Sequence, residues 1–261
     1  MAIEPFTMAI TGKGGVGKTT FTAFLIKFLL NYAHKKTLVI DADPATNLAD
    51  VLGISLLTTV GQIIDKTKQY AEKKSAMFNA GAFLEYQLWD EALLENSDFD
   101  FLAMGFTSGR GCYCLINEVL TYMLENLKSY FELVILDMDA GLEHISRNTK
   151  RSINLTFLVT DPSRMGFQTV RRIVELAHDL QSPIDQFVLI GNMFSNVQSQ
   201  ESLIKLAQDL RIEFLGTIPF DETIARMNLQ GKPLLDIPQS SSTYQKIVQF
   251  LNPLIKKRRI L

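Results

Sequence analysis

Short apolar runs alternate with longer amphipathic segments over most of the chain. Seven runs rich in apolar and β-branched residues predict strands: Phe6–Thr11, Thr37–Asp41, Asp100–Met104, Leu133–Asp137, Leu155–Thr160, Phe187–Gly191 and Glu213–Thr217. Segments with helical spacing predict helices between them, among them Lys18–Ala33, Leu115–Leu127, Phe167–Leu180 and Glu201–Leu210. Several strands are apolar at almost every position, as strands covered on both faces are. The pattern therefore predicts an α/β fold with a mostly parallel central sheet and helices on both faces.

One segment departs from this alternation. Residues 53–97, between the second and third predicted strands, look helical and are rich in Phe, Tyr, Trp and Met. We expect them to form a helical insertion on one side of the sheet. The chain of 261 residues contains no internal repeat, low-complexity linker or Pro/Gly-rich boundary, so a single domain over residues 1–261 is expected.

Charge and composition exclude several classes of protein. The formal net charge is −2, so no global basic field draws the chain to nucleic acid or anionic lipid. No run approaches the roughly 18 apolar residues of a membrane span, and the first residues lack the pattern of a secretory signal. The two cysteines are too few for a secreted disulfide framework. A cytoplasmic protein with reduced thiols, no nucleic-acid partner and no stable membrane association is expected.

The segment between the first strand and the first helix satisfies the phosphate-loop pattern G-x-x-x-x-G-K-[ST]. All its residues are expected to contact the nucleotide: Gly12, Lys13, Gly14, Gly15, Val16, Gly17, Lys18, Thr19 and Thr20. Glycines allow backbone N–H groups to turn inward and wrap phosphates at the start of the helix. Lys18 would reach the β- and γ-phosphates, and the Thr19 hydroxyl would ligate Mg²⁺. A simple glycine-rich turn is the alternative, but it would not fill every position of the pattern.

Lys13, at the second position of this loop, resembles the extra lysine of the deviant Walker A group of P-loop NTPases, which includes the ParA, MinD and nitrogenase iron-protein families. In those families this lysine reaches across a two-fold interface to the partner's phosphates. There it adds positive charge where the transition state accumulates negative charge. The resemblance implies a homodimer and a catalytic role for Lys13; a surface lysine without contacts is the alternative.

Two further acidic segments are expected to face the nucleotide. Asp41 and Asp43 follow the second strand at a carboxyl end, where the ligands of parallel sheets bind. Family resemblance assigns Asp43 to positioning the attacking water, whereas Asp41 is equally well explained as a residue that caps a loop. Asp137 ends the fourth strand and is the candidate ligand of Mg²⁺, directly or through water. Gly141 would offer a backbone N–H to the γ-phosphate and act as a hinge.

Cys112 and Cys114 are separated by one residue. Two thiolates are too few to close a structural zinc site, so this pair alone also fits small buried hydrophobic residues. A two-fold dimer would bring two such pairs together and supply four thiolates, a ligand set suited to Zn²⁺ or Ni²⁺. Because Lys13 predicts a dimer, the intersubunit metal site is the favoured interpretation.

Taken together, G-K-G-G-V-G-K-T-T, D-A-D-P-x-x-N, G-x-C-Y-C and D-M-D-A-G-L-E-H resemble the CooC family. These ATPases assist nickel insertion into carbon monoxide dehydrogenase, and a close relative serves acetyl-CoA synthase. The resemblance spans Thr7 to about Pro219. It implies an ATP-hydrolysing metallochaperone whose paired Cys112 and Cys114 hold Ni²⁺ or Zn²⁺, with one of those enzymes as client. Nitrogenase-type iron proteins carry a cysteine in the second switch, where this chain has Ala140 and Gly141.

The base of the nucleotide has weaker signals. Asn192, after the sixth strand, matches the adenine-contacting asparagine of the group, although Met193 stands where lysine commonly follows. The segment 216–221, with Pro219, resembles the loop that flanks the base. The guanine-recognition pattern N-K-x-D is absent, so ATP is expected rather than GTP.

The C-terminal segment Tyr244–Leu261 ends in four basic residues. A MinD-like interpretation makes it a membrane-seeking amphipathic helix, but Asn252–Pro253 is expected to break the helix, and a core helix with a solvated basic end is favoured. Three other functions stay open: a ParA/MinD-type spatial switch, an iron–sulfur electron donor, and an amidoligase, for which no acid-substrate pocket is recognisable.

Overall fold

The computed structural model describes residues 4–73, 79–107, 130–139, 153–182, 184–258 and 260. Its centre is a seven-stranded sheet in the order β3-β2-β4-β1-β5-β6-β7. All neighbouring strands pair in parallel, so the predicted sheet is confirmed. The strands are β1 (Phe6–Gly12), β2 (Thr37–Asp41), β3 (Asp100–Ala103), β4 (Leu133–Asp137), β5 (Leu155–Thr160), β6 (Phe187–Asn192) and β7 (Glu213–Ile218).

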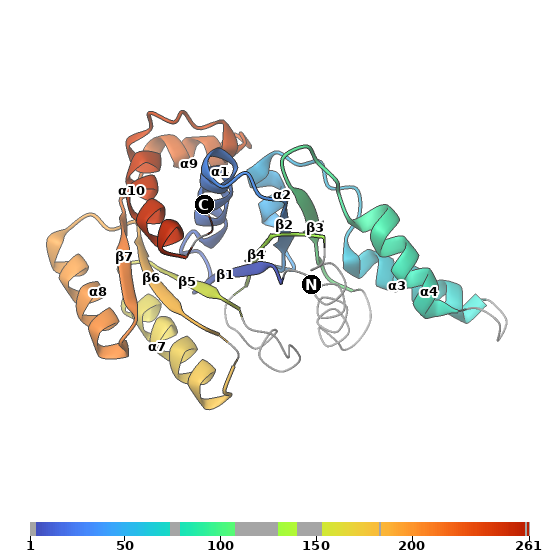
Figure 1. The fold of residues 1–261 in the computed structure, drawn as a ribbon, viewed down its shortest axis with the longest axis horizontal. Helices are drawn as coiled ribbons and strands as arrows, with labels where there is room; N and C mark the ends of the chain where they lie inside the picture. Colours follow the sequence, from blue (N-terminus) through green and yellow to red (C-terminus); the bar gives the residue numbers. More distant parts are fainter. Residues whose placement is uncertain are drawn as a thin grey trace.

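Helices cover both faces of this sheet (Figure 1). One face carries α1 (Lys18–Tyr32), α2 (Asn47–Leu52), α9 (Glu222–Leu229), the short 3₁₀-helix η2 (Leu234–Asp236) and α10 (Ser242–Lys257). The other carries α3 (Val60–Lys73), α4 (Ala80–Gln87), the π-helix η1 (Leu88–Ala92), α7 (Arg164–Asp179) and α8 (Val197–Leu210). The helix expected over Leu115–Leu127 lies outside the described residues.

The apolar runs are continuous because alternate residues enter two different cores. In β1, Met8 and Ile10 belong to the core under α1 and α10, whereas Ala9 belongs to the core under α3, α7 and α8. In β2, Val39 faces the first core and Leu38 the second. The central strands are therefore buried on both sides, whereas most of β7, at the edge of the sheet, is only partly buried.

Capping residues start two helices earlier than their apolar spacing suggests. α7 begins at Arg164 because the Ser163 hydroxyl accepts a hydrogen bond from the N–H of Gly166 at 3.0 Å. α8 begins at Val197 because the Asn196 side chain accepts from the N–H of Ser199 at 2.8 Å. The predicted starts, Phe167 and Glu201, were late because the first turns carry few apolar residues.

Between α2 and β3, the described part of residues 53–97 forms α3, α4 and η1, which extend beyond the β3 edge of the sheet in Figure 1. The Lys66 ammonium donates to both carboxylate oxygens of Glu91, at 2.7 and 2.9 Å, and so ties α3 to η1. An ideal Cβ on Gly61 would lie 2.2 Å from the carbonyl oxygen of Phe106, so α3 packs directly on the segment after β3.

The C-terminal helix α10 is a core helix, as favoured, but its predicted break is wrong. It continues through Pro253 to Lys257. A proline inside a helix removes one backbone hydrogen bond, and here the buried side chains of Leu251, Leu254 and Ile255 hold both sides of it against α1 and the sheet. Among the described residues, no helix combines the length and apolar character needed to span a bilayer.

Candidate nucleotide-binding site

The phosphate loop leaves β1 at the centre of the sheet and enters α1, whose N-terminus points at the ligand position. Gly12 is required by packing, because an ideal Cβ there would lie 2.1 Å from the carbonyl oxygen of Val159 on β5. Gly15 and Gly17 have φ angles of 79° and 88°, which favour glycine. Around Gly14, no other group lies within 4 Å of a built Cβ, so this side of the loop is open for a ligand.

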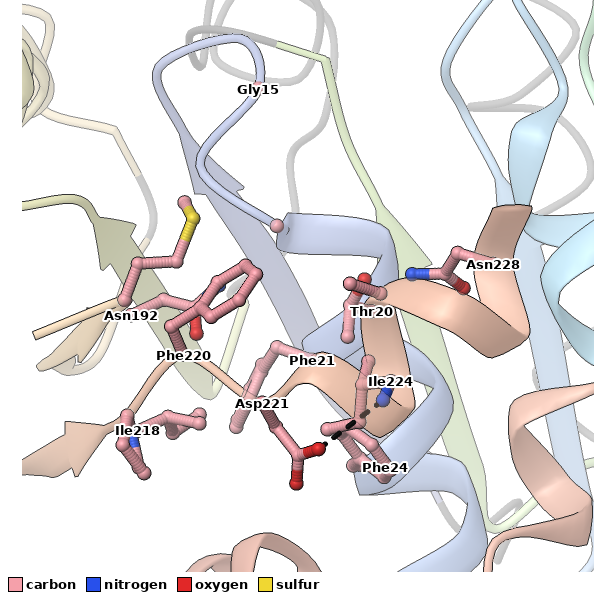
Figure 2. Close-up of a pocket in the computed structure, with 14 residues that line it drawn as sticks. Gly15, Thr20, Phe21, Phe24, Asn192, Ile218, Phe220, Asp221, Ile224 and Asn228 are labelled. Carbon is pink, nitrogen blue, oxygen red and sulfur yellow. Dashed lines mark hydrogen bonds between the residues drawn. The ribbon is translucent and has the colours of Figure 1, made fainter.

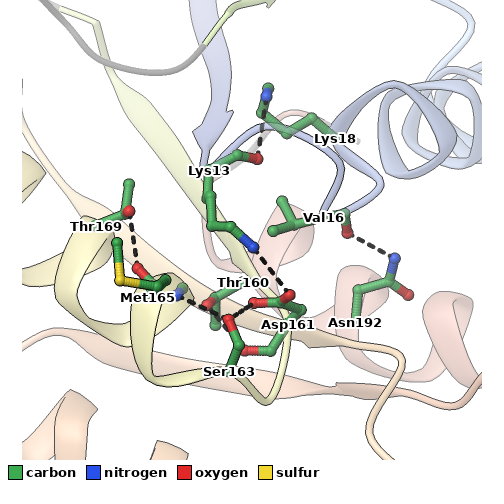
Figure 3. A network of polar contacts seen from close by, with 10 residues as sticks. Lys13, Val16, Lys18, Thr160, Asp161, Ser163, Met165, Thr169 and Asn192 are labelled. Carbon is green, nitrogen blue, oxygen red and sulfur yellow. Dashed lines mark hydrogen bonds and ion pairs between the residues drawn. The ribbon is translucent and has the colours of Figure 1, made fainter.

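Both lysines of the loop have contacts within the chain (Figure 3). The Lys18 side chain is buried, and its ammonium donates to the carbonyl oxygen of Lys13 at 3.3 Å. The Lys13 ammonium extends the other way and forms an ion pair with Asp161 Oδ2 at 3.3 Å. Lys13 is therefore a partly exposed cation at the edge of the loop, held by an acid of its own chain.

Asp161 is a site residue that the sequence analysis missed. It directly follows β5, and its Oδ1 accepts a hydrogen bond from the Ser163 hydroxyl at 2.6 Å. Burial opposes ionisation of this carboxyl, but the hydrogen bonds from Ser163 and Lys13 outweigh it and lower the pKa of Asp161. The available signal was an acid at the carboxyl end of a predicted parallel strand, the same signal that identified Asp43 and Asp137.

Asp41 and Asp137 are register partners at the carboxyl ends of the neighbouring strands β2 and β4. Both are buried. The Thr22 hydroxyl of α1 donates to Asp137 Oδ1 at 2.9 Å, whereas Oδ2 is buried without a hydrogen-bond partner among the described residues. Burial raises the pKa of Asp137 to about 6, against the opposing effects of the Thr19 and Thr22 hydroxyls and the Lys18 ammonium.

Asp41 organises the loop after β2. Its Oδ1 accepts from the N–H of Asp43 at 3.1 Å and its Oδ2 from the N–H of Leu48 at 3.0 Å, so it caps the turn into α2. Burial and the neighbouring Asp137 raise the pKa of Asp41 to about 7. Asp43 accepts from the N–H of Ala45 at 2.8 Å and lies close enough to Asp137 to raise the pKa of that carboxyl.

These residues fit a magnesium ion. Mg²⁺ prefers oxygen ligands and is commonly held by one or two protein oxygens together with substrate phosphates. The partnerless Oδ2 of Asp137 is an acceptor of this kind, and the Thr19 hydroxyl is its neighbour at the start of α1. Thr19 and Asp137 could therefore hold Mg²⁺, and their role as its ligands stays a prediction.

A pocket of about 220 Å³ lies beside the loop, between the start of α1 and the segment after β7 (Figure 2). It brings together the expected residues Gly15, Gly17, Thr20, Asn192 and Pro219. Met193 and the residues Ile218, Phe220 and Asp221 of the expected base-flanking segment also line it. The lining residues that sequence patterns did not single out are Phe21, Phe24, Ile224, Ala225 and Asn228. Most of these are apolar residues that sequence patterns assign to the core.

Asn192 has a defined orientation at the pocket. Its Nδ2 donates to the carbonyl oxygen of Val16 at 2.8 Å, which links the end of β6 to the phosphate loop. Because that carbonyl can only accept, the amide nitrogen must face it and Oδ1 is left to accept a hydrogen bond from a ligand.

Three expected site residues, Cys112, Cys114 and Gly141, lie outside the described residues. Within the described ranges, no group of three or more His, Cys, Asp or Glu side chains is arranged to hold a metal ion.

A glycine-rich loop between a central parallel strand and a helix, with a buried acid at the end of a neighbouring strand, defines a P-loop nucleoside triphosphatase. The family model of the CobQ/CobB/MinD/ParA nucleotide-binding domain matches residues 7–234. The chain therefore belongs to this family, and it is an ATP-binding P-loop ATPase.

Similar proteins agree with this assignment. An uncharacterized ATP-binding protein of Methanocaldococcus jannaschii is 35% identical over 96% of this chain and 99% of its own length. The carbon monoxide dehydrogenase accessory protein CooC of Rhodospirillum rubrum is 29% identical over 87% of this chain and 89% of its own. The crystal structure of a ParA family ATPase of Chlorobium tepidum has a TM-score of 0.68 at 17% identity, covering 96% of this chain and 99% of that one, which shows the shared fold.

Proposed function

We propose that this ATPase is a dimeric metallochaperone of the CooC type, which uses ATP to drive nickel insertion into carbon monoxide dehydrogenase or acetyl-CoA synthase. The observation that carries the proposal is the 29% identity to CooC together with the Cys112-x-Cys114 pair. In this proposal each protomer supplies one pair, and four thiolates hold Ni²⁺ or Zn²⁺ at the dimer interface. The nucleotide cycle would gather and release this metal as the dimer closes and opens.

The nucleotide chemistry follows from the residues of the loop. Lys18 would exchange its carbonyl contact for the β- and γ-phosphates. Mg²⁺, held by Thr19 and Asp137, would neutralise charge on the phosphates. Asp43 would orient the attacking water, and Gly141 would donate its N–H to the γ-phosphate. Lys13 would leave Asp161 and complete the partner's site.

Recognition of ATP rather than GTP is part of the proposal. The free Oδ1 of Asn192 is an acceptor that suits the amino group at C6 of adenine, whereas guanine presents a carbonyl oxygen at that position. Pro219 would form the opposite wall of the base site.

The proposal is tested by anaerobic titration of purified protein with Ni²⁺ and Zn²⁺, with oligomer mass measured with and without ATP. We expect one tightly bound metal per dimer. The double variant Cys112→Ala/Cys114→Ala should lose this metal and keep ATP binding. Equal metal binding by wild type and variant, or none by either, would contradict the thiolate site. Iron and acid-labile sulfide in the as-isolated protein would instead indicate an electron donor.

A spatial-positioning ATPase is the second candidate, favoured by the structural likeness to a ParA family ATPase. The packing of α10 argues against a MinD-like membrane tail. Its apolar face is in the core, and Arg258 donates to the carbonyl oxygen of Leu254 at 2.8 Å and lies 3.7 Å from Glu213. This candidate predicts ATP-dependent binding to DNA or vesicles that is unaffected by the Cys112→Ala/Cys114→Ala change.

A further inference from the structure

Thr22 is a fully buried polar residue of α1, between the buried residues Phe21 and Ala23. Its hydroxyl has two acceptors. One is the carbonyl oxygen of Lys18, one turn earlier in the same helix, at 3.1 Å. The other is Asp137 Oδ1 at the end of β4, at 2.9 Å. A hydroxyl has one hydrogen to donate, and an ionised carboxylate is a stronger acceptor than a neutral carbonyl. The ionised form of Asp137 therefore draws this hydrogen bond across from α1 to β4.

Burial of Thr22 does not by itself require Asp137. A threonine inside a helix commonly donates to the carbonyl oxygen four residues earlier. Thr67 in α3 is an example, because its hydroxyl is buried and donates to the carbonyl oxygen of Ile63 at 2.8 Å. Thr22 has the same bond available from Lys18, so the additional contact with Asp137 serves the carboxylate rather than the threonine.

The two oxygens of Asp137 have different surroundings. Oδ1 accepts from Thr22, whereas Oδ2 is buried and has no hydrogen-bond partner among the described residues. The terminal torsion of an aspartate is soft, so a carboxylate without a partner could rotate. A hydrogen bond to Oδ1 restricts this rotation and leaves Oδ2 as the oxygen that is available to a cation.

Thr19 and Thr22 lie three positions apart and so share one face of α1. Thr22 is about 4.5 Å further along the helix from the phosphate loop. Thr19 is the expected ligand of Mg²⁺, whereas Thr22 contacts Asp137 from the interior of the protein. Thr22 therefore acts on the cation site only through the carboxylate.

We propose that Thr22 is a positioning residue, whose hydroxyl orients Asp137 so that Oδ2 is presented to the Mg²⁺ that accompanies the nucleotide. Hydrogen-bond partners of metal-ligating side chains typically contribute 10- to 100-fold to metal affinity. This inference rests on the expected role of Asp137 as a magnesium ligand. It is independent of the cysteine pair and of the metallochaperone function.

The test measures ADP binding by calorimetry, first in EDTA and then over a range of Mg²⁺ concentrations. Thr22→Val keeps the shape of the side chain and removes the hydroxyl. It should raise the Mg²⁺ concentration that gives half of the increase in ADP affinity by about ten-fold or more, and should leave ADP affinity in EDTA unchanged. Thr22→Ser keeps the hydroxyl and should respond to Mg²⁺ as wild type does. Thr67→Val is the matched control, because it removes a buried helical hydroxyl on α3 and should change neither value.

The role of Asp137 is tested separately. Asp137→Asn should abolish most of the effect of Mg²⁺ on ADP affinity, and adding Thr22→Val to it should change the Mg²⁺ response no further, because the two residues act as one unit. An Mg²⁺ response that persists in Asp137→Asn would refute the ligand role on which the inference rests. A further loss in the double variant would show that Thr22 acts elsewhere and would overturn the proposal.

Three results with the single variants would also overturn it. These are a wild-type Mg²⁺ response in Thr22→Val, an equal loss of ADP affinity with and without Mg²⁺, and a Thr22→Ser variant that behaves as Thr22→Val does. If Thr22→Val does not fold, Thr22→Cys replaces it, since a thiol of similar size is a weaker donor. Its Mg²⁺ response should then be weaker than that of wild type, and an unchanged response would again contradict the proposal.

Discussion

The Lys13 ammonium lies 3.3 Å from the Asp161 carboxylate of its own chain, although 148 positions separate the two residues. The pairing of β1 with β5 brings them together. If Lys13 serves the nucleotide of a partner subunit, this ion pair must break when the dimer forms. In that case Asp161 would compete with the partner's phosphates for the same cation.

Replacing Asp161 by Asn should favour the ATP-dependent dimer. Asn removes the charge and keeps an acceptor for the Ser163 hydroxyl. An exposed ion pair contributes up to about 1 kcal/mol, and the dimer breaks one such pair in each subunit, so dimerisation should occur at up to about 30-fold lower protein concentration. Analytical ultracentrifugation with ATP measures this. Asp209→Asn, which breaks the exposed pair with Arg171, is the control. An unchanged or weaker dimer would argue against release of Lys13.

The stability of the unliganded protein should fall as pH rises. Burial raises the pKa of Asp137 to about 6 and that of Asp41 to about 7, from an ordinary value of 3.8. Between pH 4 and pH 7 these two carboxyls bind more protons in the folded state than in the unfolded state. Their contribution to the free energy of unfolding is therefore complete below pH 4 and is lost by pH 7 to 8. In Asp137→Asn the free energy of unfolding should therefore fall by about 3 kcal/mol less than in wild type as pH rises.

Urea denaturation at several pH values measures the effect. Asp90→Asn, at an exposed carboxylate on η1, should leave the profile unchanged. Saturating Mg²⁺ and ADP should also flatten it, because a cation at Asp137 favours the ionised carboxylate. If the free energy of unfolding falls with pH by the same amount in wild type and in Asp137→Asn, Asp137 does not cause the pH dependence.

Two glycines of the phosphate loop should respond differently to alanine. Gly12→Ala places a Cβ 2.1 Å from a backbone carbonyl of β5, which cannot move without disturbing the sheet, and should destabilise the fold by at least about 3 kcal/mol. Gly14→Ala meets open space, so its stability should stay within about 1 kcal/mol of wild type while ATP binds more weakly. Chemical denaturation and ATP titration separate the two effects, and equal destabilisation by both changes would refute the packing argument.

Asn192 should control the choice of base. Asn192→Ala removes the acceptor offered to adenine, so the ratio of ATP to GTP affinity should fall by about ten-fold. Asn228→Ala, on α9 in the same pocket, should leave that ratio unchanged. The measurement is competition between the two nucleotides; a ratio unaffected by Asn192→Ala would assign base selection elsewhere.

The buried face of α10 should be essential for the stability of the fold, whereas its basic end should contribute little to stability. Leu251→Ala should destabilise the protein by about 2–5 kcal/mol, because Leu251 is fully buried in the core. Lys256→Glu/Lys257→Glu changes two exposed residues and should stay within about 0.5 kcal/mol. Sedimentation with anionic vesicles should detect no binding for wild type or variant. Binding by wild type that the charge reversal abolishes would instead support a membrane tail.

Local features of the sequence were sufficient for the strands and for the glycine-rich loop between β1 and α1. The runs Thr37–Asp41, Leu133–Asp137 and Leu155–Thr160 form strands with the predicted bounds. A continuous apolar run ends at the polar or charged residue where the strand reaches solvent or the ligand-binding edge of the sheet. The end of the strand can therefore be located from the sequence alone. The phosphate loop is equally local, since a strand, a glycine turn and a helix suffice to define it.

The tertiary structure decided which distant residues meet. Pairing of β1 with β5 sets Asp161 beside Lys13, and pairing of β2 with β4 sets Asp41 beside Asp137. Residues of α1 and α9 line one pocket together with Phe220, so a residue after a strand becomes part of the nucleotide pocket. Strand order depends on the burial of both sheet faces at once, which is a property of the whole chain and has no signature at any single position. Local chemistry thus determined the strands and the phosphate loop, whereas global packing carried α10 through Pro253 and determined the partners of the charged and aromatic side chains.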